Sequence, residues 1–188
     1  MAAEPLDDLT DVLYPTESSD WGGMDQEAED SQYAGDSAPV KLGGPATPYD
    51  ALIYKMATAR GQDPNLIKAQ IAIESGFNPK AVSPKKARGL SQFMPATFAQ
   101  YGRGDPHNPE NAIEAQLNYN EHLGKMFRGD VPLMLAAYNA GEGAVQKHGG
   151  IPPYQETRKY VKDILDRYAE YTGGATPQGA AGQQIADQ

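Results

Sequence analysis

Residues 64–78 read PNLIKAQIAIESGFN, and this stretch sets the expectations for both the fold and the chemistry. Asp63 and Pro64 are typical of a helix start, with an N-cap residue followed by proline at the first helical position. Gly76 is placed to end the same helix. Glu74 shares a helical stripe with apolar residues of this segment, so part of its surroundings should be the domain interior. A carboxylate therefore closes an otherwise apolar helix.

Glu74 has two physical reasons to hold its proton. The negative end of the helix dipole disfavours an anion in the last turn. Partial burial among apolar neighbours disfavours the anion as well. Both effects raise the pKa of a carboxyl group, as a general acid at neutral pH requires. The pattern alone leaves open a plainer role, a solvated glutamate at a helix end.

The rest of the central region also has helical periodicity and punctuation. Further helices are expected over residues 47–61, 95–102, 108–127, 132–140 and 156–171. No alternating pattern predicts a strand, so the fold class is all-α, with one domain over residues 47–172. The segments 76–92 and 149–155 are rich in Gly, Pro and Ser and are expected to be loops, where functional residues often lie.

The charge of the chain is concentrated at its N-terminus. The net charge is −9, whereas residues 1–48 alone hold eleven acidic residues and one basic residue. Residues 1–46 have few large apolar side chains and are expected to be disordered. Within them Leu6, Leu9 and Leu13 follow a helical spacing that predicts a docking motif over residues 6–13. Residues 173–188 read as a flexible tail.

Several classes of protein are excluded by what the sequence lacks. The longest apolar run is too short for a transmembrane helix, and the acidic N-terminus does not have the apolar core of a signal peptide. There is no cysteine, and the three histidines lack metal-ligand spacing, so no metal site is expected. The sequence has no glycine-rich phosphate-binding motif, so no cofactor is expected. The region after residue 48 is nearly neutral, so no nucleic-acid partner is expected.

A set of motifs adds to the evidence from the single glutamate. They read ESGFNPKAVSPKKARGLSQFMPATF (74–98), NPENAI (108–113), AAYNAGEGAV (136–145) and ETRKYV (156–161). In this order they resemble the SLT-type lytic transglycosylases, which are lysozyme-like enzymes that cut bacterial peptidoglycan, over roughly residues 50–171. The resemblance implies a lysozyme-like helical domain in which Glu74 is the single acid/base.

The resemblance also implies a set of substrate-binding residues. The matched motif positions are Ser75, Ser83, Gln92, Met94, Tyr138, Asn139, Glu156 and Tyr160. This chain departs from the common pattern at Ser91, where many members of the family have methionine. Without the resemblance, the two tyrosines would be read as core aromatics. Glu156 would be a first-turn glutamate that the helix dipole favours.

Each of these residues has an expected role. Tyr138 is expected to hold Glu74 through its hydroxyl group, and Ser83 and Asn139 to orient the acetamido group of the sugar. Gln92, Met94 and Tyr160 are expected to line the sugar groove. Glu156 is expected to position the substrate or to contact its peptide stem.

The chemistry follows from having one strong carboxyl candidate. Most glycosidases use two carboxylates, so a single acid favours a substrate-assisted route in which the acetamido group of N-acetylmuramic acid stabilises C1. The resemblance implies cleavage of the bond to N-acetylglucosamine with formation of a 1,6-anhydro ring. The alternatives are a hydrolytic lysozyme of the same fold and a non-catalytic structural or peptidoglycan-binding protein.

The expected location is set by the substrate. Peptidoglycan lies outside the cytoplasm, and without a signal peptide the protein needs another route. We expect a bacteriophage virion that carries it to the host periplasm and cell wall, with a virion or envelope-machinery protein bound through residues 1–46. A specialised secretion system is the alternative.

Overall fold

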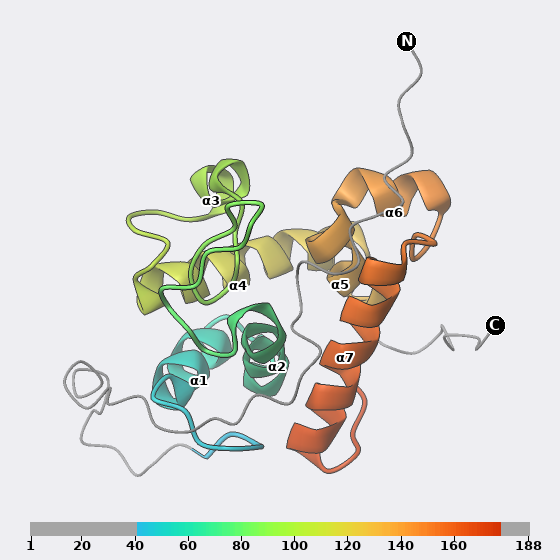
Figure 1. Cartoon of the computed structure of the whole chain (residues 1–188). Coiled ribbons are helices and arrows are strands. Elements are labelled where there is room, and N and C mark those ends of the chain that lie inside the picture. The colour runs from blue at the N-terminus through green and yellow to red at the C-terminus, as the bar shows by residue number, and fades with distance from the viewer. Residues whose placement is uncertain (1–40, 178–188) are drawn as a thin grey trace.

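Seven helices build the domain that the computed structural model describes, residues 41–177 (Figure 1). They are α1 (Asp50–Thr58), α2 (Pro64–Ser75), α3 (Pro95–Tyr101), α4 (Pro109–Met126), α5 (Val131–Ala140), α6 (Glu142–His148) and α7 (Gln155–Thr172). Within the described range the only β-type pairing is two isolated antiparallel bridges, in which Arg88 pairs with both Val82 and Phe93. The all-α prediction is confirmed.

The helix starts predicted from Asp-Pro and Asn-Pro pairs are confirmed. The Asp63 carboxylate accepts a hydrogen bond from the backbone N–H of Asn65 at 2.9 Å, and α2 begins at Pro64. Asn108 caps α4 in the same way through the N–H of Asn111, at 3.1 Å. Each side chain satisfies a backbone donor that the first helical turn leaves unpaired.

Helix α1 is shorter than the sequence predicted. It begins at Asp50 rather than next to Thr47, because the Thr47 hydroxyl donates to the Asp50 carboxylate at 2.5 Å and closes a turn ahead of the helix. It ends at Thr58, and a turn then leads to Gly61, which has a φ of 66°. Both ends differ from the predicted bounds of 47–61.

The sequence predicted no helix over residues 142–148, where the structure has α6. Glu142 is the first residue of α6, directly after Gly141 ends α5 with a φ of 86°. The carbonyl of Gly141 accepts from the N–H of Ala144 at 3.2 Å, so one residue both ends α5 and starts α6. Two glycines flanking an acid look like a loop in sequence, but here they allow two helices to meet.

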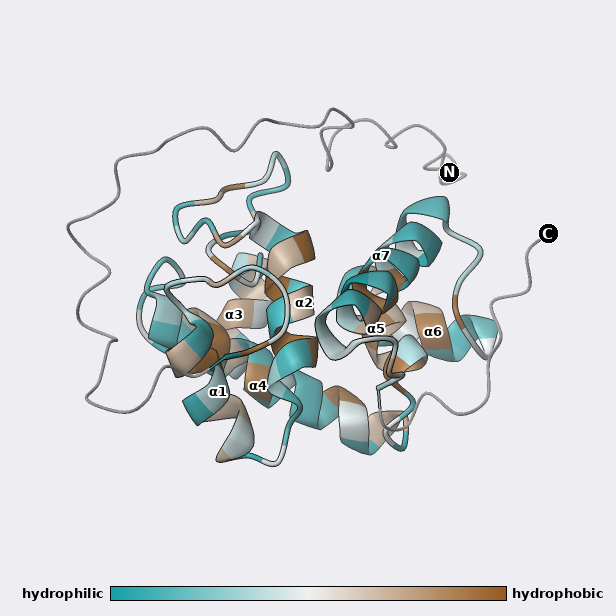
Figure 2. Ribbon diagram, turned by 90° about the horizontal axis from the view of Figure 1, so that it is seen from below, coloured by the Kyte–Doolittle hydropathy of each residue, from teal (hydrophilic) through white to brown (hydrophobic). Residues whose placement is uncertain are grey.

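Helix α2 lies at the centre of the domain. Its residues Leu66 and Ala69 belong to a buried cluster with α5 and α7, whereas Ile67 and Ile71 belong to a second cluster with α1. All six residues from 66 to 71 are buried. Figure 2 shows hydrophobic residues on α2, α4, α5 and α6, and a largely hydrophilic α7. The C-terminal end of the central helix is thus rigidly placed, and Glu74 is carried there.

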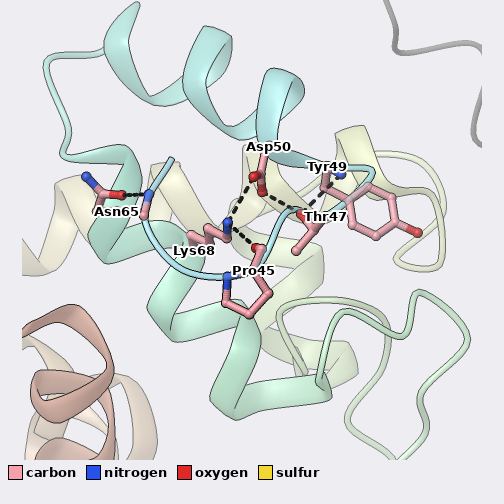
Figure 3. A network of polar contacts seen from close by, with 7 residues as sticks. Pro45, Thr47, Tyr49, Asp50, Asn65 and Lys68 are labelled. Carbon is pink, nitrogen blue, oxygen red and sulfur yellow. Dashed lines mark hydrogen bonds and ion pairs between the residues drawn. The ribbon is translucent and has the colours of Figure 1, made fainter. Parts of the chain in front are cut away.

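A charged pair lies inside this core (Figure 3). The Lys68 side chain is fully buried, and its Nζ donates to the Asp50 carboxylate at 2.9 Å and to the carbonyl of Pro45 at 2.8 Å. The ammonium also lies 5.3 Å from the centre of the Tyr171 ring. A buried charge is tolerated only with such partners. The pair ties α1 and α2 to the segment that precedes them.

The segment of residues 41–46 therefore belongs to the ordered domain, although the expected boundary was at residue 47. Leu42 is 5% exposed and joins the cluster around α1. The N–H of Gly43 donates to the Asn65 side chain at 3.0 Å. The expectations for residues 1–40, including the docking motif at 6–13, and for 178–188 lie outside the described residues.

Candidate active site

A pocket of about 510 Å³ opens at the C-terminal end of α2. It is bounded by the loop before α3, the end of α5 and the start of α7. Its lining includes Glu74, Val82, Ser83, Pro84, Lys85, Gln92, Phe93, Met94, Thr97, Tyr119, Tyr138, Asn139, Gly141 and Glu156. Seven of the nine residues predicted for the site line this pocket, and they come from four separate stretches of the chain: Glu74, Ser83, Gln92, Met94, Tyr138, Asn139 and Glu156.

Glu74 lies in the last turn of α2, where Gly76 ends the helix in the left-handed conformation with a φ of 58°. Part of the residue is open to the pocket, while protein atoms surround its carboxyl group. This burial raises the pKa of Glu74 from 4.5 to about 8, against a lowering by the hydrogen bond from Tyr160. The carboxyl group is therefore mostly protonated at neutral pH, as the sequence predicted.

The tyrosine that holds Glu74 is Tyr160, and the expectation that Tyr138 would do so is wrong. The Tyr160 hydroxyl donates to Glu74 Oε1 at 2.5 Å. The Tyr138 hydroxyl instead donates to the backbone carbonyl of Ser91 at 3.0 Å. The rest of Tyr160 is buried in the core, at 1% exposure, so it supports the carboxyl group from behind and is not among the pocket-lining residues.

Tyr138 has a different function in the pocket wall. Its ring lies 5.6 Å from that of Phe93 and 5.2 Å from that of Tyr119, measured between centres. Burial, and then the neighbouring Glu74 charge, raise the pKa of the Tyr138 hydroxyl, so it stays neutral. Phe93 and Tyr119 were not predicted for the site. Tyr119 lies four residues before Leu123 on α4, so a helical stripe was the available signal.

The loop that carries Gln92 is held by its own hydrogen bonds. Gln92 has a φ of 45°, and its side-chain amide donates to the carbonyl of Gly89 at 2.9 Å. Gly89 has a φ of 72°, and a Cβ there would lie 1.9 Å from the carbonyl oxygen of Pro106, so only glycine fits. Ser83 closes the other end of the loop, accepting the N–H of Ala87 at 3.0 Å.

Asn139 and Ser75 differ in what they offer to a ligand. The Asn139 Oδ1 accepts from the Thr157 hydroxyl at 2.8 Å, which fixes the amide and leaves its NH₂ group as the donor for a bound molecule. The Ser75 hydroxyl donates to the carbonyl of Leu90 at 2.8 Å and is not among the pocket-lining residues. Ser75 thus joins α2 to the Gln92 loop.

Met94 and Glu156 stand at the pocket edge. Met94 is 44% exposed and precedes α3, and Glu156 lies in the first turn of α7. The Glu156 carboxylate lies 3.8 Å from Nζ of Lys85. Lys85 was not predicted, because its pairing with Glu156 joins segments that are far apart in sequence. Among residues 41–177 no group of three His, Cys, Asp or Glu side chains is placed to hold a metal ion.

Comparisons with known proteins find relatives in sequence. Residues 51–161, more than half of the chain, match the family model of the transglycosylase SLT domain. The chain is 34% identical over 139 residues to the membrane-bound lytic murein transglycosylase D of Escherichia coli strain K12, covering 64% of this chain and 30% of that protein. It is 33% identical over 153 residues to the peptidoglycan transglycosylase gp16 of Escherichia phage T7, covering 70% and 12%.

A solved structure gives the same result for the fold. An inactive glutamate-to-glutamine mutant of the lytic transglycosylase Slt from Pseudomonas aeruginosa superimposes with a TM-score of 0.60. The two are 28% identical, and the match covers 65% of this chain and 24% of the other. The matched region is less than a third of the length of each of these three proteins. No helix within residues 41–177 has the length and apolarity to cross a bilayer.

Proposed function

Because the chain belongs to the transglycosylase SLT domain family, we propose that its domain is a lytic transglycosylase of peptidoglycan. It would cleave the β-1,4 bond between N-acetylmuramic acid and N-acetylglucosamine and leave a 1,6-anhydro end. The observation that carries this proposal is a buried carboxyl group, Glu74, with a pKa of about 8 and a hydroxyl donor fixed against it. The solved relative described as inactive has glutamine in place of a glutamate, which supports a catalytic role for this residue type.

The first step uses the proton on Glu74. The carboxyl group donates it to the glycosidic oxygen, the bond from C1 to that oxygen breaks, and N-acetylglucosamine leaves with a free hydroxyl group. The positive charge that develops at C1 is stabilised by the oxygen of the muramyl acetamido group. A second protein carboxylate is then not required at C1, unlike in most glycosidases.

The second step uses the same group as a base. The Glu74 carboxylate takes the proton of the muramyl C6 hydroxyl, and O6 forms a bond to C1. The 1,6-anhydro ring closes, Glu74 is protonated again, and no water is consumed. A pKa of about 8 suits both steps, because the group gives up and regains a proton near neutral pH.

The pocket residues have supporting roles in this proposal. Tyr160 holds the carboxyl group in one orientation through the hydrogen bond to Oε1. The NH₂ group of Asn139 and the hydroxyl of Ser83 contact the acetamido group. Gln92 and Met94 contact the sugar rings, and Ser75 acts indirectly by fixing the Gln92 loop to α2.

We further propose that the protein opens the cell wall locally during delivery of a phage genome. The similarity to a peptidoglycan transglycosylase of phage T7 supports this role. The acidic residues within the first 40 of the chain would bind a virion protein. A protein of a specialised secretion apparatus is the alternative partner.

The experiment that tests the function compares three proteins on purified peptidoglycan: the wild type, Glu74→Gln and Glu142→Gln. Glu142 is a matched control, since it is an acid near the site that pairs with His122 at 3.0 Å and is not among the pocket-lining residues. Mass spectrometry of the products should show anhydromuropeptides from the wild type and Glu142→Gln only. Reducing ends would indicate a lysozyme, and no new ends from any of them would indicate a binding protein.

A further inference from the structure

The loop between α2 and α3 has an uneven charge. Residues 75–104, which include this loop and α3, contain five basic residues and no acidic one, and the four that belong to the loop lie within residues 80–88. They are Lys80, Lys85, Lys86 and Arg88, with Arg103 further along. Lys80, Lys86 and Arg88 are exposed and are not among the pocket-lining residues, whereas Lys85 lines the pocket.

Lys85 reaches across the pocket edge to Glu156. Its Nζ lies 3.8 Å from the Glu156 carboxylate, and the two side chains are 50% and 29% exposed. Within the described part of the chain this is the one ion pair that the loop makes. An exposed pair at this distance contributes little to stability. Lys85 can therefore exchange Glu156 for an anionic group of a ligand at small cost.

We propose that Lys85 binds a carboxylate of the peptide branch that muramic acid carries in peptidoglycan. The inference rests on the proposed function, because it takes N-acetylmuramic acid as the sugar beside Glu74. That sugar carries its peptide on the lactyl group at O3, close to the ring that reacts. The branch must then leave the pocket past one of its edges, and the edge formed by Lys85 is the basic one.

The uneven charge of the loop supports a carboxylate rather than an uncharged group. A peptide branch whose carboxyl groups have been converted to amides has no negative charge and gains nothing from the cations of the loop. A carboxylate gains a charge-assisted hydrogen bond from Lys85 and a favourable field from the three exposed cations nearby. Lys85 is thereby a specificity residue that selects glycan strands whose peptides carry free carboxylates.

The test uses two forms of one substrate, intact glycan strands and the same strands after carbodiimide coupling to ammonia has converted the peptide carboxylates to neutral amides. Lys85→Ala should lower kcat/KM about tenfold on intact strands, mainly through KM, and leave the amidated strands unaffected. Lys86→Ala is the matched control, an exposed neighbour that is not among the pocket-lining residues, and should lower kcat/KM on intact strands far less than Lys85→Ala, because it contributes only to the field. Lys85→Arg should retain most of the preference.

A binding measurement tests the inference independently of turnover. Glu74→Gln alone and combined with Lys85→Ala are co-sedimented with intact and with amidated peptidoglycan. A loss of binding confined to the intact material when Lys85 is removed supports the inference. Equal binding with and without Lys85, or an equal loss on both materials, overturns it. Failure of the proposed function would appear differently, as the absence of new glycan ends.

Discussion

The hydroxyl group of Tyr160 donates a hydrogen bond of 2.5 Å to the carboxyl group of Glu74, although 86 residues separate the two in sequence. The contact joins the first half of α7 to the end of α2. Both residues are supported by the buried cluster that α2 and α7 share. The position of the proposed acid therefore depends on the packing of two helices and not on a loop.

Replacing Tyr160 with phenylalanine should weaken catalysis and move its pH dependence. The hydroxyl favours the carboxylate form, so its loss should raise the pKa of Glu74 above about 8 and shift the alkaline limb of the rate profile to higher pH. The loss of orientation should lower kcat about tenfold. The pH profile of kcat measures both effects.

The matched control is Tyr138→Phe, which removes the hydroxyl that donates to Ser91 at 3.0 Å. The alkaline limb should stay where it is in the wild type, even if the rate falls. A shift in Tyr138→Phe with none in Tyr160→Phe would show that the assignment of the two tyrosines is reversed.

Replacing Glu74 with glutamine should stabilise the fold at alkaline pH. The pKa of Glu74 is about 8 in the folded state against an ordinary value of 4.5, so the folded state binds the proton more tightly. Its contribution is complete below pH 4.5 and is lost as the pH rises through 8. The free energy of unfolding of Glu74→Gln relative to the wild type should increase by about 2–4 kcal/mol between pH 4.5 and 8. Urea unfolding at both pH values measures this, and a constant difference would contradict it.

Breaking the buried ion pair should cost far more stability than breaking an exposed one. Asp50→Asn leaves the Lys68 ammonium without its carboxylate inside the core and should lower the free energy of unfolding by about 3–5 kcal/mol. The exposed pair of Glu121 and Lys125 is the control, and Glu121→Gln should give no measurable change. Similar changes in the free energy of unfolding for the two substitutions, measured by urea unfolding, would contradict a large contribution of the buried pair to stability.

Truncations should locate the N-terminal edge of the domain between residues 41 and 47. A chain beginning at residue 41 should retain the stability and the activity of the full protein. A chain beginning at residue 47 loses buried Leu42 and the Pro45 carbonyl that Lys68 contacts. It should be less stable by about 3–5 kcal/mol. Thermal melting separates the two, and equal melting temperatures would mean that residues 41–46 do not contribute.

The parts of the fold that could be predicted are those with local signals. Asp63 and Asn108 each precede a proline and start a helix, and the apolar stripes follow from their spacing. Helix α6 had no such signal, because Gly141 and Gly143 around Glu142 are typical of a turn. The contribution of residues 41–46 depends on long-range contacts with Asn65 and Lys68, which composition does not reveal.

Most residues of the site were predicted from the sequence, but the roles of some of them were not. The raised pKa of Glu74 followed from its place at the end of an apolar helix. The sequence could not show that Tyr160 rather than Tyr138 contacts Glu74. Both are aromatic residues on helices, and only packing determines which hydroxyl reaches the carboxyl group. Lys85 was missed for a similar reason, since its pairing with Glu156 joins segments far apart in sequence.

The proposed mechanism requires that Glu74 keep its proton at neutral pH, and the titration of this residue tests the requirement most directly. The side-chain carboxyl carbon of Glu74 can be followed by NMR in protein labelled with ¹³C-glutamate, with Glu74→Gln identifying the signal. The predicted midpoint is about 8, caused by burial and moderated by Tyr160. A midpoint near the ordinary value of 4.5 would show that Glu74 is ionised at neutral pH, and the acid/base assignment would then be wrong.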